Sequence, residues 1–325
     1  MRAALYSEFG PIDNMRIAEL PSPKPGKDQV VVSVEAVGMA FFDVLTVEGK
    51  YQELPKPPFS PGCELSGVVK EAGEGVTSFK PGDAVFGTVL QACREEAVAD
   101  VDKLWARPAS LSPEVAAGFG TNYVTSWFAL KYRGALKPGE TLLVLGASGG
   151  VGIAAVEIGK LLGARVIACA STAEKLETCR RHGADELINY ETEDVRARIK
   201  ELTGGRGVDV CYDPVGDKYA EPMVRSMAWD GRYLIVGFAA GVPPKIPLNL
   251  ALLKGSALIG VYFGGMMAAE PQRARKIYAE IIDLVASGKL KPLISRTYAL
   301  GETVEALRAL SSRQVQGKIV VLPRK

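Results

Sequence analysis

Residues 142–163 read LLVLGASGGVGIAAVEIGKLLG, and this stretch decides the fold. A buried strand runs into a glycine-rich turn that opens a helix, with A-x-G-x-x-G at Ala147, Gly149 and Gly152. In dinucleotide-binding folds these small residues permit the tight turn, the approach of a pyrophosphate and the packing of helix on strand. The helix N-terminus then offers unpaired N–H groups to phosphate. We therefore predict that six turn residues contact a dinucleotide: Ala147, Ser148, Gly149, Gly150, Val151 and Gly152.

Strands and helices alternate regularly after this turn. Continuous apolar strands separated by helices are typical of a parallel sheet covered on both faces. The first hundred residues instead hold β-branched runs bounded by Pro and Gly turns, and the last strands abandon the strand–helix rhythm. We predict an α/β chain in which residues 124–264 form a doubly wound Rossmann sheet. Residues 1–123 and 265–325 are expected to form a separate, discontinuous β-rich domain.

The end of the second strand distinguishes between cofactors. An NAD-specific site places Asp or Glu there, about 20 residues after the turn, to bind the ribose 2′-hydroxyl. This chain has Ser171 instead, with Lys175 one helical turn later and Tyr190 at the end of the next strand. Ser171 can hydrogen-bond a 2′-phosphate and Lys175 can pair with it, although a lysine here is also typical of a solvated helix. The missing acid is the stronger argument, and we predict NADPH.

Composition excludes several classes of function. The 39 basic and 37 acidic residues are intermixed, which argues against binding to nucleic acid. No stretch is long and apolar enough to span a bilayer, and the amino terminus lacks the core of a signal peptide. Five scattered cysteines without a C-x-x-C pair favour reduced thiols. We expect a cytoplasmic protein that binds neither nucleic acid nor membrane.

The single histidine limits the chemistry further. His182 lies in the last turn of a helical pattern that ends at Gly183, where a histidine favours the negative end of the helix dipole. Zinc sites usually need several converging His or Cys ligands, and a Ser-His-Asp triad needs a histidine placed as a base. We therefore expect neither a metal site nor such a triad.

Segments along nearly the whole chain together resemble the zinc-free quinone oxidoreductases of the medium-chain dehydrogenase/reductase superfamily. They are GMAFFDVLTVEGKY (38–51), PGCELSGVV (61–69), KPGDAVFG (80–87), GASGGVG (146–152), INY (188–190), DPVG (213–216), VGFAAG (236–241) and SSRQVQGK (311–318). The resemblance implies a GroES-like catalytic domain beside the Rossmann domain, with the active site in the cleft between them. It also implies that zinc is absent, because zinc-dependent relatives carry G-H-E where this chain has Gly62, Cys63 and Glu64.

The resemblance also assigns site residues. Thr125 resembles the residue that meets the nicotinamide amide, and Phe238, with Phe263 nearby, is expected against the nicotinamide. The 2′-phosphate contacts of the family match four positions here: Ser171, Lys175, Tyr190 and Arg313. Arg313 lies far along the chain in the other domain, so its contact would couple cofactor binding to cleft closure. Ala40 stands where the family often has Asn, which removes one polar contact and leaves the acceptor preference open.

The mechanism needs a hydrogen-bond donor in place of zinc. Tyr51 resembles a pocket tyrosine of the family and is our candidate, and Asn122 is a second residue expected to line the cleft. Each also fits an ordinary interfacial or capping role. A quinol anion is a modest base, so a site poor in general acids suits a quinone better than an unactivated ketone.

We therefore predict a metal-free NADPH:quinone oxidoreductase that acts on a small electrophilic acceptor. An enone or enoyl-thioester reductase is the alternative, and a non-catalytic NADPH-binding protein is a more distant one. Residues 256–265 read as an edge strand, SALIGVYFGG. Pairing of this strand across a two-fold axis would cover its unpaired backbone groups and predicts a homodimer.

Overall fold

The computed structural model describes residues 1–325, which form two units. Unit 1 comprises Met1–Thr121 and Pro292–Lys325, and unit 2 comprises Asn122–Lys291. The chain therefore passes between the units twice, at residues 121–122 and at residues 291–292. No helix combines the length and the apolar character needed to cross a membrane.

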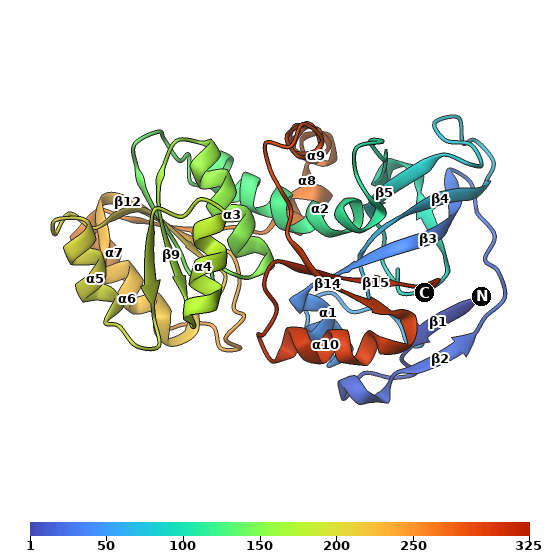
Figure 1. The fold of residues 1–325 in the computed structure, drawn as a ribbon, viewed down its shortest axis with the longest axis horizontal. Helices are drawn as coiled ribbons and strands as arrows, with labels where there is room; N and C mark the ends of the chain where they lie inside the picture. Colours follow the sequence, from blue (N-terminus) through green and yellow to red (C-terminus); the bar gives the residue numbers. More distant parts are fainter. The chain divides into compact units, whose positions relative to one another are not determined.

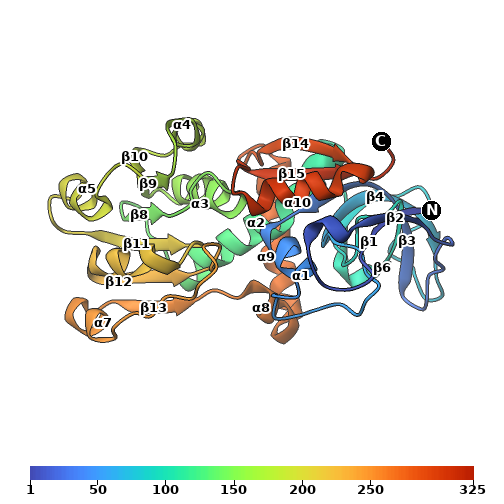
Figure 2. The same ribbon diagram turned by 90° about the horizontal axis from the view of Figure 1, so that it is seen from below.

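Unit 2 is built on a six-stranded sheet in which every neighbouring pair is parallel. Its strand order is β10-β9-β8-β11-β12-β13, which can be followed in Figure 2. The strands are β8 (Thr141–Val144), β9 (Arg165–Ala170), β10 (Glu186–Asn189), β11 (Val208–Asp213), β12 (Met227–Ile235) and β13 (Ala257–Gly260). The order reverses beside β8, and ligands bind at such a switch point in open α/β sheets. The predicted doubly wound sheet is confirmed.

Helices cover both faces of this sheet, as Figure 1 shows. On one face lie α3 (Gly150–Leu161) and α4 (Ala173–Arg181). The opposite face carries α5 (Val195–Leu202), η4 (Asp217–Tyr219), α6 (Ala220–Arg225) and α7 (Asn249–Lys254). β8 is buried throughout because its apolar side chains meet helices on both sides.

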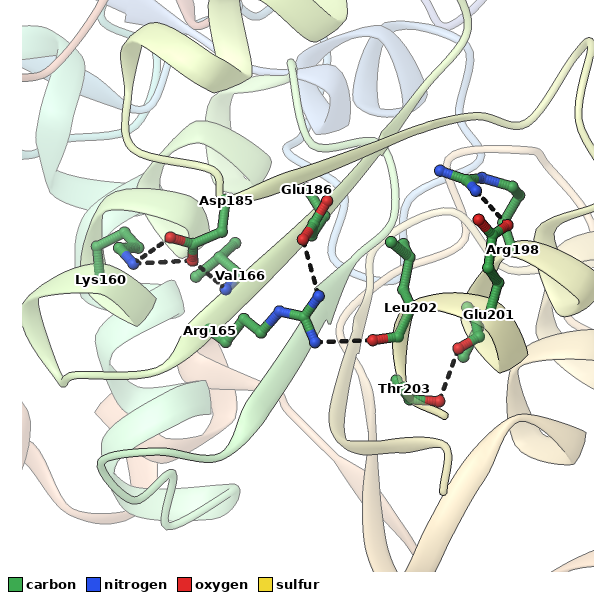
Figure 3. A network of polar contacts seen from close by, with 10 residues as sticks. Lys160, Arg165, Val166, Asp185, Glu186, Arg198, Glu201, Leu202 and Thr203 are labelled. Carbon is green, nitrogen blue, oxygen red and sulfur yellow. Dashed lines mark hydrogen bonds and ion pairs between the residues drawn. The ribbon is translucent and has the colours of Figure 1, made fainter. Parts of the chain in front are cut away.

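Polar contacts hold the outer strands to their helices (Figure 3). Lys160 of α3 pairs with Asp185 at 2.7 Å, and the same carboxylate accepts the backbone N–H of Val166 at 2.7 Å. Arg165 contacts the carboxylate of Glu186 and the carbonyl of Leu202, each at 2.8 Å. These contacts fix α3, β9, β10 and α5 relative to one another.

Unit 2 also contains the end of α2 (Pro113–Trp127), a π-helical turn η3 (Phe128–Arg133), α8 (Phe263–Ala269) and α9 (Pro271–Ala286). Glu280 of α9 accepts hydrogen bonds from Trp127 Nε1 at 2.7 Å and from the Tyr132 hydroxyl at 2.8 Å. These bonds hold α9 to the helix that precedes the sheet. Residues 265–291, which the sequence pattern assigns to the other domain, therefore lie in unit 2.

Unit 1 contains a seven-stranded mixed sheet and a small β1–β2 hairpin sheet. β15 pairs with β3 in antiparallel register, so the carboxy-terminal strands return to this unit as expected. The strands are β1 (Arg2–Leu5), β2 (Arg16–Glu19), β3 (Gln29–Met39), β4 (Glu64–Ala72), β5 (Ala84–Thr88), β6 (Glu96–Asp100), β7 (Leu104–Ala106), β14 (Ile294–Ala299) and β15 (Lys318–Leu322). The helices are η1 (Ile12–Asn14), α1 (Phe41–Val47), η2 (Val101–Lys103), η5 (Leu300–Glu302) and α10 (Thr303–Ser311).

Candidate dinucleotide-binding site

The glycine-rich turn joins β8 to α3 at the switch point of the sheet. Gly146 adopts a positive φ of 55°, a backbone conformation that favours glycine. The N–H of Gly149 donates to the carbonyl of Gly146 at 3.0 Å, which closes the turn. The N–H of Ala147 donates to the carbonyl of Cys169 in β9 at 3.0 Å and ties the turn to the sheet.

Two glycines of the turn have different surroundings. A Cβ on Gly152 would lie 2.3 Å from the carbonyl oxygen of Gly146 and 2.7 Å from the backbone of Ala147. A Cβ on Gly149 would meet only the Gly146 oxygen, at 3.4 Å, and the φ of Gly149 is −74°. Gly152 is therefore needed for close packing of α3 on the turn, whereas Gly149 leaves open space over the helix N-terminus.

The first turn of α3 has the properties of an anion site. Its N-cap, Gly149, has no side chain to accept from the first N–H groups, and no acidic residue lies in that turn. The leading amides therefore lack helical partners and point outward from the positive end of the helix dipole. A dinucleotide pyrophosphate fits this cradle.

Asn122 and Thr125 lie on α2 beside the start of α3. A Cβ on Gly150 would come within 2.3 Å of the Asn122 amide nitrogen, so the buried Asn122 side chain lies directly against the first residue of α3. Ser126 donates to the carbonyl of Val151 at 3.0 Å. Thr125 is three residues from Asn122 and shares its side of the helix. The structure thus brings Asn122 to the phosphate-binding turn, and the contact of Thr125 with the nicotinamide amide stays a prediction.

The predicted 2′-phosphate contacts of unit 2 also lie together. Lys175 Nζ is 3.2 Å from Ser171 Oγ, and the N–H of Tyr190 donates to the carbonyl of Ala170 at 3.2 Å. Burial raises the pKa of Tyr190, and a hydrogen bond with Ser171 opposes that rise. The Tyr190 ring is 4.9 Å from that of Tyr219, a neighbour that the sequence reasoning missed. No sequence motif pointed to Tyr219, because it follows β11, whereas Ser171 follows β9 and Tyr190 follows β10.

Phe238 and Phe263 have different environments. Phe238, which follows β12, is 40% exposed, and a Cβ on Gly216 would lie 2.9 Å from its ring. Phe263 is buried, with ring centroids 5.7 Å from Phe128 and 6.0 Å from Tyr278. Core packing accounts for Phe263, and its expected contact with a nicotinamide stays a prediction.

Asp213 shapes the loop that lies beside Phe238. Its carboxylate accepts the N–H of Val215 at 2.7 Å, the N–H of Gly216 at 2.9 Å and the hydroxyl of Tyr233. Burial raises the pKa of Asp213 above its usual value, and these three hydrogen bonds oppose the rise because they favour the ionised carboxylate. The DPVG segment is therefore held at the carboxyl end of β11, next to the glycine-rich turn.

Two predicted residues belong to unit 1. The Tyr51 ring stacks on that of Phe42, with centroids 5.4 Å apart, just beyond α1. Arg313 follows α10 with a positive φ of 56°. The proton-donor role of Tyr51 and the phosphate contact of Arg313 stay predictions.

Unit 1 also contains a buried polar cluster that the sequence did not reveal. Lys318 Nζ pairs with Glu64 at 2.7 Å, and both side chains are 4% exposed. Asp43 accepts the N–H groups of Ala40 at 2.8 Å and Gly62 at 2.9 Å, and burial raises its pKa to about 6. Lys318 escaped notice because it opens an apolar strand from a distant part of the chain. No group of three or more His, Cys, Asp or Glu side chains is arranged to hold a metal ion.

Known proteins share this architecture over the whole chain. The family profile described as alcohol dehydrogenase GroES-like domain matches residues 26–127, and that described as zinc-binding dehydrogenase matches residues 150–287. A quinone oxidoreductase-like protein 2 homolog of Nematostella vectensis is 39% identical over 300 residues, covering 91% of this chain and 82% of that protein. The chain belongs to the quinone oxidoreductase family of the medium-chain dehydrogenase/reductase superfamily.

Solved structures of the superfamily agree with this assignment. Escherichia coli quinone oxidoreductase complexed with NADPH superposes with a TM-score of 0.92 at 28% identity, covering 99% of this chain and 100% of that chain. The CurK enoyl reductase superposes with a TM-score of 0.90 at 25% identity, covering 99% of each chain. Unit 1 of this quinone oxidoreductase family member thus contains the predicted GroES-like domain, and the predicted fold class and family are confirmed.

The two glycines of the turn are expected to respond differently to an added methyl group. Gly152→Ala should destabilise the protein by about 1–3 kcal/mol, because the new Cβ must displace backbone atoms of the turn. Gly149→Ala should unfold at nearly the wild-type temperature. Thermal unfolding followed by circular dichroism compares the two variants. Equal midpoints for both would contradict the packing role of Gly152.

Proposed function

We propose that this member of the quinone oxidoreductase family reduces quinones or similar electrophilic acceptors with NADPH. One observation carries the proposal: an uncapped helix N-terminus lies at the switch point of the sheet, and Ser171, Lys175 and Tyr190 converge at the end of the adjacent strand β9. The first feature suits a pyrophosphate, and the second suits a 2′-phosphate. The E. coli structure named above was solved with NADPH.

The residues of this chain have distinct tasks in the proposed reaction. NADPH, when bound, supplies a hydride to the acceptor. The α3 N-terminus and Lys175 bind its phosphates, while Thr125 and Phe238 orient its nicotinamide end. Tyr51 donates a hydrogen bond to the acceptor oxygen, on which negative charge develops. Reduction of a quinone to its quinol then takes one hydride and one proton, with Tyr51 or solvent as the proton source.

A reductase of enones or enoyl thioesters is the second candidate. The similarity to the CurK enoyl reductase favours it. Stopped-flow NADPH oxidation against a quinone, an alkenal and an enoyl-CoA separates the two. Fast turnover with the quinone alone supports our proposal, whereas turnover confined to the enoyl-CoA overturns it in favour of the alternative.

We also propose that the reaction needs no metal. Both oxygens of Glu64 already accept hydrogen bonds, one from Lys318 and one from the N–H of Thr121, and the Cys63 thiol is buried with its pKa raised well above the usual range. These groups lie where zinc-dependent relatives carry the G-H-E motif. The same acceptor assay after dialysis against a strong chelator tests this: full activity supports it, and loss of activity that zinc restores contradicts it.

A cytoplasmic location is proposed as well. All five cysteines are buried and unpaired, as is usual in a reducing compartment. Fractionation of the native cells, with the protein detected by antibody, tests this proposal.

Lys175→Ala is expected to weaken NADPH binding by about 10- to 100-fold, because one charge-assisted contact with the 2′-phosphate is lost. NADH affinity should change little. Fluorescence titration with both nucleotides measures the effect, and Lys200→Ala, on the exposed side of α5, is the control. Similar losses for NADPH and NADH would refute the assignment.

Tyr51→Phe is expected to lower kcat by roughly tenfold with an unchanged Kd for NADPH, because only the hydrogen bond to the acceptor is lost. Steady-state kinetics and a separate nucleotide titration supply the two values. Phe42→Leu is the matched control, since it removes the stacking partner and leaves the hydroxyl. Unaltered turnover of Tyr51→Phe across the acceptor panel would exclude Tyr51 from the mechanism.

We also propose that the protein forms a homodimer in which β13 of one copy contacts β13 of the other. β13 ends the strand order of the sheet, so one side of its backbone has no neighbouring strand. Trp229 is 77% exposed and Leu252 is 79% exposed. The Trp229 ring lies against Gly255, which joins α7 to β13, so these apolar side chains border the edge strand. A second copy of the chain fits this surface because an isologous contact pairs β13 with itself.

The double variant Trp229→Glu/Leu252→Glu should convert a dimer into a monomer of 34.6 kDa, because charges would be buried in the contact. Size-exclusion chromatography with light scattering gives the mass. Leu90→Glu, at an apolar residue of unit 1 that is also exposed, serves as the control. A wild-type protein that is already monomeric would contradict the proposal.

A further inference from the structure

Glu157 is a largely buried carboxylate in the middle of α3 that neither the nucleotide site nor the acceptor chemistry uses. One of its oxygens accepts both the Tyr123 hydroxyl at 3.0 Å and the backbone N–H of Lys291 at 2.9 Å. The other oxygen lies 2.6 Å from Nδ1 of His182, the single histidine of the chain. The Glu157 side chain is only 10% exposed, so the loss of these partners would be costly.

The partners of Glu157 lie where the chain enters and leaves unit 2. Tyr123 is the second residue after the first passage between the units, and Lys291 is the last residue before the second passage. They are 34 and 134 residues from Glu157 in the sequence. One carboxylate therefore holds both connecting segments to the helix whose first turn forms the nucleotide cradle.

Unit 1 holds the other ends of the same two segments. Glu64 accepts the backbone N–H of Thr121, the last residue before the first passage, and forms the buried ion pair with Lys318. The backbone N–H of Lys318 donates to the carbonyl of Leu293, the second residue of the second segment of unit 1, at 2.8 Å. Glu64 thus contacts the first segment through its carboxylate, and Lys318, its ion-pair partner, contacts the second through its backbone.

We propose that Glu157 in unit 2 and the Glu64–Lys318 pair in unit 1 are positioning residues that fix both connections between the units. Any bending between the units is then confined to residues 121–122, which lie inside α2, and to residues 291–292. Because Glu157 belongs to α3, the nucleotide-binding helix is joined to both connections. The effect of these residues on catalysis rests on the proposed function. Only a reaction that uses residues of both units would depend on where the two connections bend.

Glutamine can replace Glu157 without loss of the two connecting hydrogen bonds. Its amide oxygen can accept from Tyr123 and Lys291, and its amide nitrogen can donate to His182 Nδ1 in the other tautomer. Alanine provides none of these groups. The pair Glu157→Gln and Glu157→Ala therefore separates the hydrogen bonds from the charge.

Hydrogen exchange of the protein without nucleotide is the first test. In Glu157→Ala, amides of residues 119–127 and 286–295 should exchange at least about tenfold faster than in wild type, whereas Glu157→Gln should retain the slow rates. Lys160→Gln is the control, because it removes the ion pair with Asp185 one helical turn further along α3. Unchanged exchange in Glu157→Ala, or an equal increase in Lys160→Gln, overturns the proposal.

Tyr123→Phe keeps the test valid if Glu157→Ala does not fold. It removes a single hydroxyl and should raise exchange in residues 119–127 while leaving residues 286–295 as in wild type. If Tyr123→Phe leaves the exchange rates of residues 119–127 as they are in wild type, the proposal is also overturned.

Kinetics distinguish positioning from simple stabilisation. Glu157→Ala should lower kcat at saturating NADPH by about tenfold, with the Kd for NADPH within about threefold of wild type, and Glu157→Gln should restore kcat. Unchanged kcat, or equal losses in kcat and NADPH affinity, overturns the positioning role. The exchange measurement needs neither nucleotide nor acceptor, so a protein that oxidises no NADPH would refute the proposed function and leave the anchoring roles standing.

Discussion

The close packing of Gly152 against the backbone of Gly146 and Ala147 is the constraint on which the site depends. Without a side chain at Gly152, α3 begins directly over the end of β8, and its free amides face the switch point of the sheet. Unpaired amides at a helix end need a partner, and phosphate oxygens provide one. The same packing places Asn122 and Ser126 of α2 beside the first turn of α3.

Carboxylates that accept several hydrogen bonds hold other parts of the fold in place. Asp213 holds the loop after β11, Asp43 holds the start of α1 against Gly62, and Glu280 holds α9 to η3. Each accepts several hydrogen bonds, at least one of them from outside its own segment of chain, which offsets the cost of removing the charge from water. Burial raises the pKa of Asp43 to about 6 in spite of its two backbone donors.

The Glu64–Lys318 pair is a buried ion pair in the segment for which we propose that no zinc is held. Here an ammonium group supplied by the carboxy-terminal strand neutralises Glu64 inside the sheet. The buried position keeps this ion pair away from solvent screening, so removal of either partner would leave an uncompensated charge.

The sequence by itself determined the parallel sheet, the glycine-rich turn, the family and the Ser171–Lys175–Tyr190 group, because each depends on local spacing or on motifs within one strand–helix unit. Only the tertiary structure decided which unit holds residues 265–291, that Phe263 is a core residue, that Glu157 binds both connecting segments and that Glu64 binds the first of them. These outcomes depend on contacts between residues far apart in the chain. A largely buried Glu on a helix or a Lys at the start of an apolar strand has no distinctive local pattern, since its partner is chosen by the folded topology.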